Sequence, residues 1–471
     1  MKHRYQVIVA GGGASGMTAA ILAAGSGLRT AVLEAGETVG KKLLATGNGK
    51  CNFTNSLQTP DCYRGSGAEA AGWLLKRCGT DRVLSFFEQI GIYPKERNGY
   101  WYPNSGQAAS VREALYEELL RSGADVITCC RVKSVEPAES ISRKQRTGNG
   151  KTGLERASSG APCRPRFRIT AGKRELLSSE PSRPERKKKE KPRYSEEREI
   201  FFEADHVILA CGGSAGSFSG AEGSGFAVAE ELGLGMAEPV PALVQLRAAE
   251  RECGVLSGVR LEAAGKLILP GGAVFRERGE FLFTDYGISG IPAMQLSRFA
   301  SVYLNRAAKP QDGCPKLFLD FFPDTEENKL AFLLEERFRR FGWRSAEGVL
   351  LGLLPSKLNY VLLCLAGLAP EKRPEPDSGF PEKAGRMLAG RMKRFLLTIT
   401  GTNSFDSAQV TAGGVLMEEL SADTLEAKRI PGLYVTGELA DVDGTCGGYN
   451  LHWAWMSGMA AAESIIRNEG N

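Results

Sequence analysis

The chain has 471 residues, of which 42% are hydrophobic and 24% charged. These proportions exclude a disordered or fibrous protein and leave material for a large core. Three histidines and 11 cysteines without a CxxC pair argue against a zinc site and a disulfide framework. No apolar run approaches the roughly 18 residues of a membrane span, and the N-terminus does not resemble a signal peptide. We therefore expect a cytoplasmic protein with no metal site and no membrane partner.

The formal net charge of +5 is unevenly distributed along the chain. Residues 131–200 hold 20 Lys and Arg against 10 Asp and Glu, a local charge of +10, so the rest of the chain carries −5. Residues 137–198 predict a basic β-hairpin insertion with two long polar loops. An RNA-binding arm is the alternative, but the segment lacks interleaved aromatic residues that would stack on bases. We expect no nucleic-acid partner, and the oligomeric state stays open.

The N-terminal residues predict a β-α-β unit. Residues 5–10 (YQVIVA) form a buried strand that runs into Gly11-Gly12-Gly13-Ala14-Ser15-Gly16 and a helix of small residues, and a second strand at 30–33 ends in Glu34. Glycines at 11, 13 and 16 allow a tight turn, close approach of a phosphate and helix–strand contact. Glu34 can accept hydrogen bonds from ribose hydroxyls and would repel a 2′-phosphate, which indicates FAD or NAD.

Further elements follow in chain order. Helices are expected near 72–90 and 106–122, a strand at 125–135, an edge-type strand at 166–170, two short strands at 199–204 and 205–210, a β-rich region at 240–300, a helical region at 325–395 that includes helices at 326–341 and 383–397, a strand at 432–435 and a helix at 454–466.

The C-terminal part favours FAD over NAD. The strand at 432–435 leads into Thr436-Gly437-Glu438, then Asp441 and the glycine-rich run 444–450 before the last helix. Amides at the start of that helix could stabilise negative charge on a reduced flavin. A domain that binds only NAD has no need of this C-terminal return.

Five segments together resemble one family. They are GGGASGMTAA (11–20), KKLLATGNGKCNFTN (41–55), GEFLFTDYGISGIPAMQLS (279–297), AQVTAGGV (408–415) and TGELADVDGTCGGYNLHWAWMSG (436–458). The sequence is similar to the NAD(P)/FAD-dependent, aminoacetone-oxidase-family bacterial flavoproteins, which include a 3-dehydro-bile acid Δ4,6-reductase. The resemblance covers nearly the whole chain except about 137–198.

The resemblance implies an α/β fold of the two-dinucleotide-binding-domain type. A Rossmann-like FAD-binding domain would comprise 1–215 and 405–471. A β-barrel-like domain at 240–320 and 395–412 and a helical domain at 325–395 would be inserted in it.

The resemblance also implies the cofactor contacts. These are Gly11, Gly13, Ala14, Ser15, Gly16, Glu34, Ala35, Lys41, Lys42, Gly47, Asn48, Gly49, Cys51, Asn52, Val132, Ala210, Gly212, Gly213, Gly437, Glu438, Asp441, Gly447, Gly448, Tyr449, Asn450 and Leu451. The family has Gln more often than His at the position of His452.

Three residues are candidate catalytic acids. His452 follows the glycine-rich run and could donate a proton, or hydrogen-bond a backbone group instead. Tyr286 and Tyr449 could hold a carbonyl oxygen, or pack against the cofactor. Cys51 has no second cysteine at redox-motif spacing, so a buried thiol is expected rather than a dithiol relay.

The predicted function is that of an FAD-dependent oxidoreductase. No second nucleotide motif is found, so NAD(P)H would bind transiently in the substrate cleft. The resemblance implies reduction of a conjugated C=C bond of an enone, such as a steroid or bile acid. Two alternatives stay open: an oxidase that passes electrons from a small amine to O2, and a flavin-containing RNA-associated protein.

Overall fold

The computed structural model describes residues 3–138, 166–177, 193–216, 223–306, 313–374 and 379–470. Most of the predicted insertion at 137–198 lies outside these residues. The chain divides into two compact units. The first unit consists of Met1–Pro239 and Val410–Asn471, and the second unit consists of Val240–Gln409. Each unit is described here by itself. Within the described ranges, no helix is long and apolar enough to cross a membrane.

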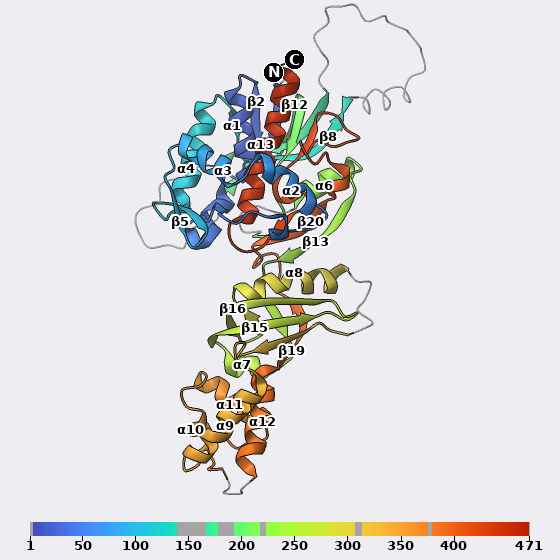
Figure 1. Ribbon diagram of the computed structural model, residues 1–471. Helices are drawn as coiled ribbons and strands as arrows, with labels where there is room; N and C mark the ends of the chain where they lie inside the picture. Colours follow the sequence, from blue (N-terminus) through green and yellow to red (C-terminus); the bar gives the residue numbers. More distant parts are fainter. Residues whose placement is uncertain are drawn as a thin grey trace, which may run out of the picture. The chain divides into compact units, whose positions relative to one another are not determined.

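The first unit is built on a twisted sheet with a parallel core (Figure 1). Its parallel strands lie in the order β7 (Asp125–Ile127), β2 (Thr30–Leu33), β1 (His3–Ala10), β12 (Arg198–Leu209) and β21 (Leu433–Val435). This order, in which strands are added on both sides of β1, is that of a Rossmann-like sheet.

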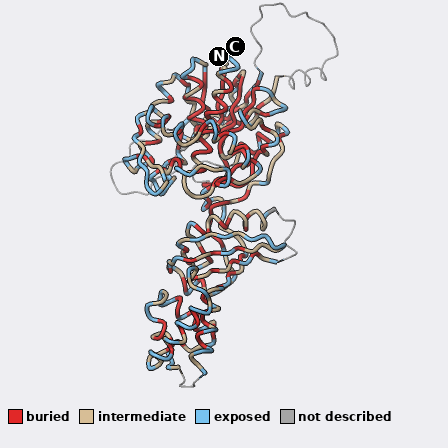
Figure 2. The backbone as a smooth tube through the Cα atoms, viewed as in Figure 1, coloured by how far each residue is buried: buried red, intermediate tan, exposed pale blue. Residues whose placement is uncertain are grey.

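Helices α1 (Ala14–Gly25) and α13 (Tyr449–Glu469) pack closely in this unit. Their small residues allow the contact, because a Cβ added to Gly458 would lie 2.4 Å from the carbonyl oxygen of Ser15. The residues of β2 are all buried, as are the last four of β1. Figure 2 shows the buried segments, drawn in red, gathered in the interior of this unit. Strands of a parallel sheet that is covered on both faces have nearly continuous apolar sequences, as these two strands do.

Three details of the sheet differ from the predictions. The strand expected at 125–135 is two strands, β7 and β8 (Cys130–Pro137), separated at Cys129, which has a φ of +50°. The strands expected at 199–204 and 205–210 are the single strand β12. Its first half pairs with β9 (Phe167–Lys173) and its last residues with β21. β9 lies between β12 and β8, so the prediction of an edge strand is wrong.

Shorter elements complete the first unit. They are the 3-10 segments η1 (Lys41–Gly49), η2 (Pro60–Cys62), η4 (Met417–Glu419) and η5 (Gly437–Leu439), helices α2 (Ala68–Arg77), α3 (Thr80–Gln89), α4 (Ala108–Arg121) and α6 (Ser224–Glu231), and strands β3 (Thr54–Asn55), β4 (Tyr63–Arg64), β5 (Pro94–Arg97), β6 (Tyr100–Pro103), β10 (Leu176–Leu177), β11 (Arg193–Tyr194), β20 (Val410–Val415) and β22 (Asp443–Gly444). β20 pairs with β13 (Met236–Ala242).

The second unit contains a closed barrel and a group of helices. The barrel order is β14 (Leu246–Ala248), β17 (Gly287–Ser289), β16 (Val274–Thr284), β15 (Arg260–Ile268), β18 (Lys316–Asp320) and β19 (Phe395–Thr402). The helices are α7 (Glu252–Leu256), α8 (Ile291–Arg306), α9 (Glu327–Phe341), α10 (Ala346–Leu350), α11 (Ser356–Leu365) and α12 (Phe380–Lys393).

One apolar core joins the barrel and the helices of this unit, from Leu246 to Ile399. The helix expected at 383–397 ends at Lys393, because the next residues, FLLTITGT, alternate between buried and less buried positions as strand β19. The predicted α/β class, with a Rossmann-like sheet, an inserted barrel and inserted helices, is confirmed.

Candidate functional site

Four strands of the parallel sheet end next to one another, and each is followed by a turn that contains glycine or an acidic residue. Backbone hydrogen bonds fix this row: Gly11 N donates to Leu33 O at 2.8 Å, Ala210 N to Ala10 O at 2.8 Å, and Thr436 N to Leu209 O at 2.9 Å. Ligands of open α/β sheets bind outside the carboxyl ends of the strands. The turns after β1, β2, β12 and β21 therefore form the candidate site.

The turn between β1 and α1 has the conformation that its glycines allow. Gly11 has a φ of +106°, and a Cβ added there would lie 2.4 Å from the carbonyl oxygen of Ala210. A Cβ at Gly16 would lie 2.0 Å from the oxygen of Gly11, whereas a Cβ at Gly13 would meet nothing within 4 Å. Gly13 is the N-cap of α1 and gives it no side-chain cap, and the first turn has no acidic residue. The helix thus presents amide donors and positive potential to open space.

Glu34 lies beside this turn, at the end of β2. Its Oε2 accepts a hydrogen bond from Gly12 N at 2.8 Å, and its Oε1 accepts one from Gly36 N at 2.6 Å. A carboxylate has about four lone-pair sites, so each oxygen can accept one more hydrogen bond. Glu34 is therefore held in place and still able to bind hydroxyl groups, as predicted for a ribose contact.

The segment after residue 40 forms an exposed left-handed turn. Gly47, Asn48 and Gly49 have φ values of +55°, +53° and +81°. Cys51, at φ +56°, is fully buried, and burial raises the pKa of its thiol to about 12. A thiol with such a pKa stays protonated at neutral pH, which agrees with the expectation of a packed thiol.

Asn52 connects this segment to the start of the last helix. With its amide oxygen toward Gly448, Asn52 accepts from Gly448 N at 3.2 Å, and its amide nitrogen donates to the carbonyl oxygens of Trp101 and Thr54 at 3.1 and 2.9 Å. Residues 52 and 448 are thereby held at one site, although they are far apart in the sequence.

A network centred on Glu438 joins three of the turns. Its Oε2 accepts from Lys42 Nζ at 2.6 Å, and its Oε1 accepts from Thr411 N at 2.6 Å. The Thr411 hydroxyl in turn accepts from the backbone amides of Ser214 and Ala215 at 2.9 and 3.0 Å. Thr411 was not among the predicted site residues, although it lies in the motif AQVTAGGV that carried the resemblance.

Asp441 has one oxygen without a partner. Its Oδ2 accepts from Ser66 N at 2.8 Å, while its Oδ1 is buried and has no hydrogen-bond partner among the described residues. Leaving a buried acceptor unsatisfied costs about 1–3 kcal/mol. This oxygen can accept a hydrogen bond from a bound ligand. Ser66 is not among the predicted site residues, because no motif surrounds it in the sequence.

The glycine-rich run before α13 is shaped by side chains from both chain ends. Asn450 Oδ1 accepts from Gly444 N, and its Nδ2 donates to Gly444 O, both at 2.8 Å. Asn55 Nδ2 donates to Gly447 O at 3.0 Å. Gly447 and Gly448 have φ values of +128° and +91°, and Gly448, the N-cap of α13, provides no side-chain cap. A second helix N-terminus therefore offers amide donors at this site.

His452 is fully buried, and both of its ring nitrogens have partners. Nε2 lies 3.1 Å from the carbonyl oxygen of Cys78, so Nε2 carries the hydrogen, because a carbonyl can only accept. Nδ1 then accepts from the Thr54 hydroxyl at 2.7 Å. Burial lowers the pKa of His452 to about 4. These contacts favour a positioning role; the catalytic role predicted from the sequence stays a prediction.

The two candidate tyrosines lie in different units. Tyr449 belongs to the first unit, where it is buried and its ring meets that of Tyr63 edge-on at 6.1 Å; burial raises the pKa of its hydroxyl. Tyr286 belongs to the second unit, where its hydroxyl accepts from Asn403 Nδ2 at 3.0 Å and the Arg247 guanidinium lies 5.4 Å from its ring centre. Both remain candidate acids.

The other predicted contacts follow these turns. Ala14, Ser15, Ala35, Lys41, Gly212, Gly213, Gly437 and Leu451 lie in or directly beside the segments described above. Val132 lies in β8, which begins where Cys130 N donates to Glu34 O at 2.8 Å. All residues predicted as cofactor contacts thus belong to the first unit, whereas Tyr286, a predicted catalytic residue, belongs to the other unit.

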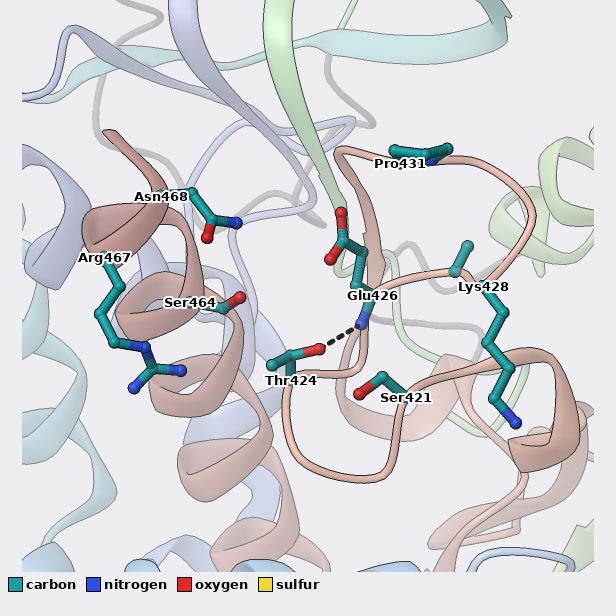
Figure 3. Close-up of a pocket in the computed structure, with 9 residues that line it drawn as sticks. Ser421, Thr424, Glu426, Lys428, Pro431, Ser464, Arg467 and Asn468 are labelled. Atoms are coloured by element: carbon teal, nitrogen blue, oxygen red, sulfur yellow. Dashed lines mark hydrogen bonds between the residues drawn. The ribbon is translucent and has the colours of Figure 1, made fainter. Parts of the chain in front are cut away.

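A cavity of about 400 Å³ lies elsewhere in the first unit (Figure 3). Ser464, Arg467 and Asn468 line it from the last turns of α13, together with residues of the 421–431 loop. These positions are about 15 residues, or about 22 Å, along the helix from the glycine-rich run. The cavity is therefore separate from the candidate site. Across the described ranges, no cluster of three or more His, Cys, Asp or Glu could hold a metal ion.

The sequence of the chain is similar to one protein family and to several characterised proteins. Residues 5–156 and 174–464 match the family described as HI0933-like protein Rossmann domain. The chain is 37% identical over 462 residues to a 3-dehydro-bile acid delta(4,6)-reductase of Clostridium scindens, covering 97% of this chain and 98% of that protein. It is 26% identical over 470 residues to a ribosomal RNA dihydrouridine synthase of Escherichia coli, covering 98% of each chain.

Among solved structures, the chain resembles the 3-ketosteroid-Δ4-(5α)-dehydrogenase of Rhodococcus jostii RHA1 in complex with 4-androstene-3,17-dione. The TM-score is 0.48 at 15% identity, with 98% of this chain and 97% of that chain covered.

Proposed function

The chain belongs to the HI0933-like protein Rossmann domain family. On that premise we propose that it is an FAD-dependent oxidoreductase, and that it reduces a C=C bond conjugated to a carbonyl group. One observation carries this proposal: the row of turns at the ends of β1, β2, β12 and β21 presents two helix N-termini without side-chain caps and one buried carboxylate oxygen without a partner. An extended ligand with phosphates in its middle and polar groups at both ends fits these donors and acceptors.

Three features of the first unit support FAD as that ligand. The open position at Gly13 would accept a pyrophosphate next to the amides of α1, where a side chain would fill the space. Glu34 would bind the adenosine ribose. Asp441 Oδ1 would accept from a hydroxyl or N–H of the flavin half, and the amides at the start of α13 would stabilise negative charge on the flavin ring.

The proposed reaction class is the one shared by the reactions that the relatives' names describe. A 3-dehydro-bile acid Δ4,6-reductase acts on C=C bonds conjugated to a 3-keto group. A dihydrouridine synthase saturates the C5–C6 double bond of uracil, which is conjugated to the C4 carbonyl. Both reactions add a hydride to the electron-poor carbon of the conjugated bond, which is β to the carbonyl in an enone and δ to it in the Δ6 bond of a 4,6-dienone, and a proton to the enolate that results. This shared chemistry is what we propose for the present chain, with NAD(P)H as the reductant.

When bound, FAD would pass the two electrons and one hydrogen of NAD(P)H to the substrate carbon as hydride. Tyr449 is suited to hold the carbonyl oxygen, because its raised pKa keeps the hydroxyl protonated at neutral pH. The side chain of Cys51 takes no part in the electron transfer in this proposal.

Anaerobic reduction of the purified protein tests the proposal. NADH or NADPH should bleach the flavin absorbance, and a 3-keto-Δ4 steroid or uridine-containing RNA should restore it. Tyr449→Phe should slow the second step, and Tyr434→Phe should not, because buried Tyr434 lies in β21 and bonds Ser464. Failure of both nucleotides to bleach the flavin would overturn the assignment, and peroxide formation with a small amine would favour the oxidase alternative.

A uracil base in RNA is the second candidate substrate. The ribosomal RNA dihydrouridine synthases of Escherichia coli and Haemophilus influenzae align with 98% and 99% of this chain, at 26% and 27% identity. Their alignment over nearly the full chain supports the RNA-associated alternative, which the composition of residues 131–200 alone did not favour.

A further inference from the structure

The helices of the second unit carry a group of arginines around one aromatic ring. The guanidinium carbons of Arg337, Arg340 and Arg344 lie 5.4, 5.4 and 5.1 Å from the ring centre of Phe341, at the end of α9. Arg344 also lies 4.7 Å from the ring centre of Trp343. Three like charges around one ring repel one another, so the arrangement gives a region of positive potential.

Two of these arginines have no acidic partner among the described residues. The adjacent Arg339 pairs with Glu335 and Glu336. Within the described part of the chain, neither Arg340 nor Arg344 forms an ion pair with a carboxylate. Their donors are thus available to an anion from outside the chain.

Arg337 is half-buried and its guanidinium is held by backbone carbonyls. Its Nε donates to the carbonyl oxygen of Val349 at 2.9 Å and its Nη2 to that of Leu351 at 2.8 Å. Burial, followed by the nearby charge of Arg344, lowers the pKa of Arg337. The positive charge of Arg344 therefore acts on Arg337, and no carboxylate of the described residues neutralises it.

Trp343 adds an exposed stacking surface. Its side chain is 63% exposed, whereas Trp453 and Trp455 of α13 are buried. Solvent-exposed tryptophan next to unpaired arginine is a combination typical of surfaces that bind single-stranded nucleic acid, where bases stack on the ring and guanidinium groups bind phosphate.

The basic segment of the first unit differs from this group in its described part. There Lys133 and Arg174 both pair with Glu197, at 2.7 and 3.0 Å. Its charges are thus partly neutralised by carboxylates of the same sheet. The described residues that combine unpaired arginine with an exposed indole are those at the end of α9.

We propose that Arg340, Phe341, Trp343 and Arg344, named here the arginine–tryptophan surface, bind RNA. The inference deepens the second candidate of the proposed function, in which the reduced C=C bond belongs to a uracil base. RNA is favoured over an anionic membrane because a lipid headgroup supplies phosphate but no flat base to stack on Trp343. It is favoured over an acidic protein because guanidinium groups beside an aromatic ring suit phosphate and base together.

Binding of the full-length holoprotein to a labelled oligouridylate of about 12 nucleotides tests the surface. Arg340→Gln with Arg344→Gln should weaken binding at least about tenfold near 50 mM salt and reduce the salt dependence by about 1.4 in log–log slope, the value for two phosphate contacts on a single strand. Trp343→Ala should weaken binding about fivefold to a hundredfold and leave the slope unchanged.

The matched control is Arg278→Gln with Arg386→Gln. It removes the same charge from exposed arginines of the second unit that are paired with Asp324 and Glu382. The proposal is overturned if the control and the test variant lose the same affinity, if the unmodified protein does not bind the oligouridylate, or if vesicles of phosphatidylglycerol bind through these arginines while RNA does not.

Flavin content and anaerobic NAD(P)H oxidation of the same preparations separate this inference from the proposed function. A variant that reduces its flavin normally but has lost RNA affinity supports the surface. A colourless protein that still binds RNA through Arg340 and Arg344 supports the surface and refutes the flavin chemistry.

Discussion

The Nδ1 atom of His452 lies 2.7 Å from the Thr54 hydroxyl, which joins the first turn of α13 to the segment that follows Asn52. The same imidazole reaches the end of α2 through Cys78 O. His452 thus fixes three elements around the glycine-rich run, and in its neutral form it donates through Nε2 and accepts through Nδ1.

This relationship predicts a pH dependence of stability. Below its unfolded pKa of 6.5, His452 takes up a proton in the unfolded chain, whereas the folded chain resists protonation down to about pH 4. The unfolded state then binds more protons than the folded state. Lowering the pH from 6.5 to 4 therefore lowers the free energy of unfolding, by about 3 kcal/mol in total. Chemical denaturation between pH 7 and pH 4 should show this loss, and His452→Gln should remove it. An unchanged slope in the variant would contradict the contacts described.

The same variant addresses catalysis. If His452 positions the turn, His452→Gln should change kcat less than about threefold between pH 6 and 8, since the group does not titrate in that range. A loss on the order of a hundredfold or more, rescued by no change of pH, would instead support the proton transfer predicted from the sequence.

Glu34→Arg should lower FAD affinity by about tenfold or more, because it removes the acceptor of the Gly12 and Gly36 amides and of the proposed ribose contact. Glu37→Arg makes the same charge change three residues away, at an exposed side chain, and should retain the cofactor. Titration of both apoproteins with FAD measures the difference. Equal affinities would refute the ribose contact.

Asp441→Asn should also weaken FAD binding, because it places an amide donor or a weaker acceptor where the partnerless Oδ1 lies. The melting temperature of the apoprotein should stay unchanged or rise, since a buried unsatisfied charge is relieved. Asp205→Asn is the control: Asp205 also has a buried Oδ1 without a hydrogen bond, but it lies within β12 and faces Arg4. If the two variants bind FAD alike, Asp441 does not contact the cofactor.

Cys51→Ala should leave the rate of flavin reduction by NAD(P)H within about twofold of the unmodified enzyme. The thiol is buried and its pKa is about 12, so no thiolate is present at neutral pH to exchange electrons. Stopped-flow absorbance measures this rate. A stable charge-transfer band that disappears in the variant would show that the thiolate does take part.

The parts of the site that sequence alone could predict are those with a local signal. The spacing of Gly11, Gly13 and Gly16 and the position of Glu34 each follow from one β-α-β unit. Long-range partners leave no such signal. The amide of Ser66 and the hydroxyl of Thr411 matter only because the fold brings them to Asp441 and to the Ser214 amide.

The sheet shows the same limit. β12 was predicted as two strands because nothing in its own sequence shows that its two halves pair with different neighbours, β9 and β21. Similarly, Lys42 and Glu438 were both predicted as cofactor contacts, but their 2.6 Å ion pair could not be read from residues 396 positions apart.

The flavin content of the freshly purified protein decides whether the turns of both chain ends bind FAD. We expect a yellow protein with about one FAD per chain, or one that reaches this ratio after incubation with FAD. A protein that stays colourless and binds no FAD would refute the proposed function, because these turns would then hold no flavin.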